Sequence, residues 1–132
     1  MPQVQDNEAQ PKVVPPRGGL MHLIDATGYS LAGFRRLMGE TAARHELLGG
    51  ALGAGLLVWA GAGVGQWLGF AALFCALLAT EALNTAIEVL VDHLSPGWSR
   101  MAKDAKDLGS LAVGLMVLAN VAFVGAVVTG LL

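Results

Sequence analysis

The chain has 132 residues, of which 55% are hydrophobic and only 14% are charged. Soluble domains average about 25% charged residues, so this composition is typical of an integral membrane protein with little mass outside the bilayer. The formal net charge of −2 excludes a general nucleic-acid-binding protein, and the single Cys75 excludes an internal disulfide.

The first segment, residues 1–19, reads MPQVQDNEAQPKVVPPRGG and contains no continuous apolar stretch. Acidic residues near its start and the missing apolar stretch distinguish it from a secretory signal. We predict a disordered tail, because four of the five prolines lie here and nothing in it can form a core. Met21, where more ordered sequence begins, is an alternative start of the natural chain.

Residues 20–45 mix apolar and polar side chains at helical spacing. One apolar stripe is formed by Leu20, Leu23, Ile24, Leu31, Phe34, Leu37 and Met38. Arg35, Arg36 and Arg44 lie near the polar side of the same helix. The segment is too polar to cross a bilayer, and the pattern predicts an amphipathic helix that lies on the membrane surface.

Three apolar runs follow, at about residues 47–64, 67–91 and 108–132. A membrane span needs about 20 apolar residues, and a lipid environment favours helices because they satisfy their own backbone hydrogen bonds. The fold class is therefore predicted as an all-α membrane protein with three transmembrane helices and an N-terminal surface helix. Glycines in the first run, such as Gly49 and Gly53, indicate close helix packing.

The basic residues predict how the chain crosses the membrane. Five of the eight Lys and Arg residues precede the first apolar run, and the other three lie between the second and third. The positive-inside rule then places the N-terminus and the loop at about 93–106 in the cytoplasm and the C-terminus outside.

Polar residues within the second apolar run are the main functional signal. In the segment EALNTAIEVLVDH, Glu81, Asn84, Glu88 and Asp92 fall at about 0°, 300°, 340° and 20° around a helix, which is one stripe. A charged residue near the bilayer centre costs at least about 2.5–3.5 kcal/mol, so two glutamates on this face indicate a functional site. The alternative is a packing role, in which Asn84 and Thr85 form hydrogen bonds between helices. Asn120, isolated in the third run, favours such a packing role.

The loop SPGWSRMAKDAKDLGS adds Lys106 and Asp107 at the start of the third run, level with the stripe if the second and third runs form a hairpin. Carboxylates beside lysine at a membrane surface are typical of a site for a divalent cation and a polyphosphate, since Mg²⁺ takes oxygen ligands and lysine pairs with phosphate. Arg100 and Lys103 fit a topological or lipid-headgroup role better.

The segment EALNTAIEVLVDH followed by AKDLGSLAV closely resembles the signature of the prokaryotic integral-membrane diacylglycerol kinase family. The upstream segment GYSLAGFRRLMGETAARHE resembles the surface helix of the same family, so the resemblance covers about residues 20–132 as one kinase domain. Two features differ from enterobacterial relatives: His22 stands in place of an arginine, and the segment between Gly33 and Glu40 is one residue shorter.

This resemblance implies a homotrimeric lipid kinase of the bacterial inner membrane. It would transfer the γ-phosphoryl group of MgATP to the primary hydroxyl of diacylglycerol and form phosphatidic acid. By the family pattern Glu81 is the general base with Asn84 beside it, and Glu40 and Glu88 are the Mg²⁺ ligands. The implied nucleotide-binding residues are Tyr29, Asp92, Gly97, Trp98, Ser99, Lys106 and Asp107.

Three alternatives stay open from the sequence. The loop SPGWSRMAK is similar to that of relatives that phosphorylate undecaprenol. A proton- or ion-coupled transport subunit would also place acids on a span, but it would need them near the midplane or on both sides of the membrane. A structural or regulatory subunit would explain the small size and leave the acidic stripe unexplained.

Overall fold

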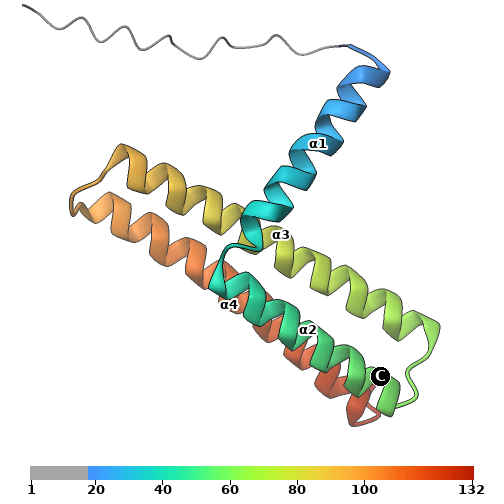
Figure 1. Ribbon diagram of the computed structural model, residues 1–132. Helices are drawn as coiled ribbons and strands as arrows, with labels where there is room; N and C mark the ends of the chain where they lie inside the picture. The colour runs from blue at the N-terminus through green and yellow to red at the C-terminus, as the bar shows by residue number, and fades with distance from the viewer. Residues whose placement is uncertain (1–17) are drawn as a thin grey trace, which may run out of the picture.

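The computed structural model of this protein describes residues 18–132, so the predicted tail lies almost entirely outside the described residues. All regular elements of residues 18–132 are helices: α1 (Leu20–Leu37), α2 (Thr41–Trp59), α3 (Val64–Leu94) and α4 (Arg100–Val128). The last three helices run side by side as an elongated bundle, and α1 projects away from the place where it meets α3 (Figure 1).

The amphipathic helix expected for residues 20–45 is interrupted. It ends at Leu37, and a turn over residues 38–40 leads into α2. Hydrogen bonds from the Gly39 and Glu40 amides to the carbonyls of Arg36 and Leu37, at 3.1 and 2.9 Å, tighten this turn. A side chain at position 39 would place its Cβ only 3.1 Å from the Arg36 carbonyl oxygen, so glycine suits the turn.

Helix α3 contains the predicted span 67–91 and extends beyond it at both ends, whereas α4 starts before the predicted span 108–132 and ends at Val128. The early start of α4 has a local cause, because Ser99 caps the helix by accepting a hydrogen bond from the Ala102 amide at 3.1 Å. Both helices are long and apolar enough to cross a membrane.

Helix α2 differs from the first predicted span, 47–64. It begins six residues earlier with the polar sequence TAARHE and ends at Trp59, where Gly61 reverses the chain with a φ of 68°. Within the described residues only α3 and α4 are both long enough and apolar enough to cross a membrane. A third span therefore stays a prediction.

Polar contacts fix how α3 and α4 pair as an antiparallel hairpin. Near the connecting loop, the Lys106 ammonium lies 2.5 Å from the Asp92 carboxylate. Farther along the hairpin, the Asn120 side-chain amide donates to the carbonyl of Leu73 on α3 at 3.1 Å and to that of Met116 at 2.9 Å. Asn120 therefore has the interhelical role that the sequence predicted.

The bundle's apolar core lies toward the end opposite the α3–α4 loop and is centred on Leu57, Phe70 and Val127. Phe70 packs edge-on against Trp67 and stacks on Phe74. Gly53 of α2 lies against the Phe70 ring, where an added Cβ would come within 3.1 Å of it, whereas Gly49 has no such neighbour.

Most apolar side chains of α3 and α4 are nonetheless exposed in the single chain. They include Leu83, Leu90, Leu111, Leu115 and Leu118. Long apolar helices with this much exposed surface fit a lipid environment or contact with other protein chains.

Replacing Asn120 by alanine is expected to lower the free energy of unfolding by about 0.6–1.7 kcal/mol, because it removes a hydrogen bond between helices. Reversible unfolding in mixed detergent micelles measures this change. Asp104→Asn, at an exposed polar position of the same helix, is the control and should stay within about 0.5 kcal/mol of the parent protein. An Asn120→Ala variant as stable as the parent protein would contradict the proposed contribution of this bond.

Candidate active site

The acidic stripe on α3 changes gradually from buried to exposed. Glu81 is 4% exposed and Asn84 is 9% exposed, while Glu88 is half-buried and Asp92 is exposed near the end of the helix. Glu81 lies about 16 Å from Asp92 along the helix axis. The stripe therefore leads from the solvent-exposed end of α3 to a carboxylate inside the protein.

Other carboxylates lie around Glu81. Glu88 of α3 and Glu40, which precedes α2, are close enough to repel its charge. Glu46 in the first turns of α2 also repels Glu81. These four residues, the carboxylate cluster, come together because the α1–α2 turn and the start of α2 lie beside the middle of α3 (Figure 1).

Only some carboxylate oxygens of the carboxylate cluster have hydrogen-bond or ion-pair partners. Glu40 forms an ion pair with Arg36, and Glu88 accepts a hydrogen bond from the Asn84 side-chain amide at 3.3 Å. Glu46 has one buried carboxylate oxygen, Oε2, without a hydrogen-bond partner among residues 18–132. Repelling carboxylates with so few donors favour the binding of a cation.

Residues 18–132 contain no group of three or more His, Cys, Asp or Glu side chains placed to hold a metal ion together. Mg²⁺ does not need such a group, because it is commonly held by one or two carboxylates together with phosphate oxygens. The predicted ligands Glu40 and Glu88 both lie close enough to Glu81 to repel its charge, and their role as Mg²⁺ ligands stays a prediction.

The predicted nucleotide-binding residues are distributed over the outer part of the molecule. Lys106 pairs with Asp92 across the α3–α4 hairpin, while Asp107 pairs with Lys103 on α4 itself. Tyr29 and Trp98 are 75% and 85% exposed.

The loop residues among them have local partners. Ser99 caps α4, and the Gly97 carbonyl accepts a hydrogen bond from the Ser95 hydroxyl at 3.3 Å. In the part of the chain that the structure describes, none of Tyr29, Gly97, Trp98 and Ser99 shares a hydrogen bond or ion pair with the carboxylate cluster.

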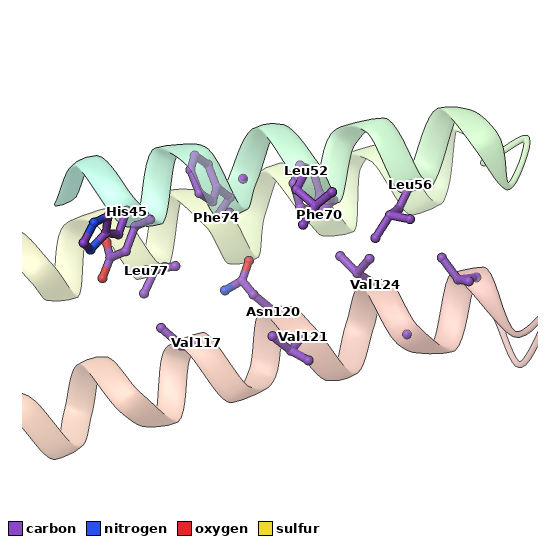
Figure 2. Close-up of a pocket in the computed structure, with 15 residues that line it drawn as sticks. His45, Leu52, Leu56, Phe70, Phe74, Leu77, Val117, Asn120, Val121 and Val124 are labelled. Carbon is purple, nitrogen blue, oxygen red and sulfur yellow. The ribbon is translucent and has the colours of Figure 1, made fainter. Parts of the chain in front are cut away.

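A mainly apolar cavity of about 570 Å³ lies between α2, α3 and α4. Figure 2 shows Phe70 and Phe74 on the side of α3, Val121 and Val124 on α4, and the Asn120 amide directed into the space between the helices. His45 and Glu46 form its polar end. Because Glu46 also belongs to the carboxylate cluster, the cavity begins beside the site.

Glu46 is the residue that the sequence analysis missed. It fell between the expected surface helix, residues 20–45, and the first apolar run, which it directly precedes. A carboxylate at such a border is a detectable signal, but its proximity to Glu81 depends on how α2 packs against α3.

The molecule thus belongs to the class of small helical membrane proteins whose acidic site lies between an apolar interior and a charged surface. The family model for prokaryotic diacylglycerol kinase matches residues 28–128. A diacylglycerol kinase of Sinorhizobium sp is 46% identical over 110 residues, which cover 83% of this chain and 80% of that protein. The diacylglycerol kinase of Pseudomonas aeruginosa is 37% identical over 95 residues, with 71% and 77% covered.

A third relative, the diacylglycerol kinase of Escherichia coli K12, is 31% identical over 112 residues that cover 78% of this chain and 85% of that protein. The chain belongs to the prokaryotic diacylglycerol kinase family. The resemblance seen in its signature is confirmed, and as a member of this family the chain is an ATP-dependent lipid kinase.

Replacing Glu46 by glutamine is expected to raise the free energy of unfolding of the ligand-free protein by about 0.5–2 kcal/mol above pH 7, because burial first and repulsion from Glu81 second disfavour the charge of Glu46 and raise its pKa to about 7. Thermal unfolding in detergent with a metal chelator measures this change. Asp104→Asn is the control, since Asp104 is exposed and lies 3.9 Å from Arg100. A Glu46→Gln variant that is equally or less stable above pH 7 would show that the charge of Glu46 does not lower the stability of the protein.

Proposed function

We propose that this chain transfers the γ-phosphoryl group of MgATP to the primary hydroxyl of diacylglycerol and forms phosphatidic acid at the cytoplasmic face of a bacterial membrane. The observation that carries the proposal is the buried Glu81 on a helix apolar enough to span a membrane, with other carboxylates beside it. The names of the relatives, all diacylglycerol kinases, support the choice of lipid.

Glu81 acts in this proposal as the general base. A lipid hydroxyl stays close to the apolar region, and Glu81 lies below the exposed end of α3, so a lipid that reaches this buried carboxylate would not need to leave the membrane. The hydroxyl oxygen forms a bond to the γ-phosphorus, the bond from that phosphorus to the β,γ-bridging oxygen breaks, and the hydroxyl proton passes to Glu81. ADP leaves with the bridging oxygen.

Glu40 and Glu88 would hold Mg²⁺ together with the phosphates of ATP. Their fit rests on the repulsion within the carboxylate cluster and on the oxygen ligands that Mg²⁺ requires. When bound, the cation would neutralise charge on the phosphates. Asn84 orients Glu88 through their hydrogen bond and lies one helical turn from the base.

The nucleotide-binding role is proposed for residues near the α3–α4 loop and on α1. These residues are Tyr29, Asp92, Gly97, Trp98, Ser99, Lys106 and Asp107. Lys106 supplies a positive charge for phosphate oxygens, and releasing its contact with Asp92 would make it available. The exposed rings of Tyr29 and Trp98 remain accessible to a nucleotide or to another subunit.

We also propose a homotrimer with three spans per chain, a cytoplasmic N-terminus and an external C-terminus. The exposed apolar faces of α3 and α4 support contacts between subunits. Tyr29 and Trp98 are strongly exposed while Glu81 is buried, which supports a site completed by a neighbouring subunit. The distribution of Lys and Arg supports the orientation.

The second candidate substrate is undecaprenol, favoured by the loop sequence SPGWSRMAK. It is a lipid alcohol too, so the same base and the same nucleotide site would serve it. The transport subunit weighed from the sequence has no comparable support, since the family and the relatives are kinases.

The test is a side-by-side kinase assay of the purified protein in lipid micelles with labelled ATP and Mg²⁺. We expect labelled phosphatidic acid from diacylglycerol and less product from undecaprenol. A preference for undecaprenol would make undecaprenol the proposed substrate instead of diacylglycerol. Absence of activity on both lipids would overturn the proposed function.

In the same assay Glu81→Gln is expected to lower kcat by about 10²–10⁴-fold, because the amide cannot accept the hydroxyl proton. Its affinity for ATP should stay close to that of the parent protein. Asp104→Asn, an acid-to-amide change on the exposed side of α4, serves as the matched control. Turnover retained in Glu81→Gln would exclude Glu81 as the base.

A further inference from the structure

Asn84 and Gly109 form an unusually close contact between α3 and α4 beside the carboxylate cluster. Both residues are buried. A Cβ built on Gly109 would overlap the side-chain oxygen of Asn84 and come within 3.2 Å of its Cγ. Any residue other than glycine at position 109 must therefore displace the Asn84 side chain or push the helices apart.

This requirement is specific to one glycine of α4. Gly114 and Gly125, on the same helix, have no atom within 4 Å of where a Cβ would stand. Glycine in the middle of a helix costs about 1 kcal/mol relative to alanine, so its presence at a contact point needs a reason. At position 109 the reason is the space that the Asn84 amide occupies.

The two ends of the Asn84 amide have different surroundings. The nitrogen donates to the Glu88 carboxylate at 3.3 Å, whereas the oxygen is buried without a conventional hydrogen-bond partner among residues 18–132. In glycine a hydrogen takes the place of Cβ, so the Cα–H group of Gly109 points at this oxygen. Such Cα–H···O contacts recur where helices pack closely.

We infer that Gly109 is a positioning residue. Because it has no side chain, it leaves room for the Asn84 side-chain amide and keeps the amide nitrogen directed at Glu88. The opposite orientation would turn the amide oxygen toward a carboxylate, where the two would repel. With Asn84 in place one oxygen of Glu88 is engaged and the other is available to MgATP. This consequence rests on the role proposed above for Glu88.

The test compares Gly109→Ala with Gly114→Ala, which adds the same methyl group to the same helix in open space. We expect Gly109→Ala to shift the side-chain amide resonances of Asn84 in ¹⁵N-labelled protein and Gly114→Ala to leave them unchanged. In the kinase assay Gly109→Ala should lower kcat by about 10- to 100-fold and raise the Mg²⁺ concentration for half-maximal rate, with KM for diacylglycerol unchanged.

A double-mutant cycle of unfolding free energies, called the stability cycle below, tests the inference even if Gly109→Ala folds poorly. Asn84→Ala removes the atoms that the new methyl group would meet, so the double variant Asn84→Ala/Gly109→Ala should recover the stability that Gly109→Ala loses. Absence of this recovery, or Asn84 resonances and kcat unchanged in Gly109→Ala, would overturn the inference.

The same variants separate this inference from the proposed function. Full turnover in Asn84→Ala would remove Asn84 from the proposed site. The amide resonances and the stability cycle would even then decide whether Gly109 seats Asn84.

Discussion

The structure depends on burying one carboxylate, that of Glu81, on α3, a helix that is mostly apolar. Glu81 is buried, and the carboxylates of Glu40, Glu46 and Glu88 lie close enough to repel a negative charge there. Such an arrangement lowers stability unless a cation, a proton or a substrate hydroxyl group compensates for it. The chain thus retains a locally unfavourable arrangement, which is a common feature of functional sites.

The α3–α4 hairpin holds this arrangement in place. It is aligned by the Lys106–Asp92 pair near the loop, by the contact of Asn84 with Gly109 at the site and by the Asn120 hydrogen bond to Leu73 deeper in the bundle. Together these contacts fix which residue of α4 faces the acidic stripe. A small change in that register would break the contact between Asn84 and Gly109. Helix packing deeper in the bundle therefore affects the geometry of the proposed site.

Much of the hairpin can be predicted from the sequence, because hydropathy and the helical period are local signals that α3 and α4 both carry. The acidic stripe and the role of Asn120 follow from the same signals. The turn at residues 38–40 does not, since the amphipathic pattern continues on both sides of it. The roles of Glu46 and Gly109 depend on which residues of another helix lie opposite, and one sequence does not contain that information. The assignments of Tyr29 and Trp98 to the nucleotide stay predictions.

The central claim is that the carboxylates are tolerated because they hold nucleotide-bound Mg²⁺. Its most direct test is thermal unfolding with Mg²⁺ and a non-hydrolysable ATP analogue, compared between the parent protein and Glu88→Gln. At a ligand concentration of 100 times Kd, the parent protein should gain about 2.7 kcal/mol and the variant much less. Equal stabilisation of both proteins, or none of the parent protein, would contradict the claim.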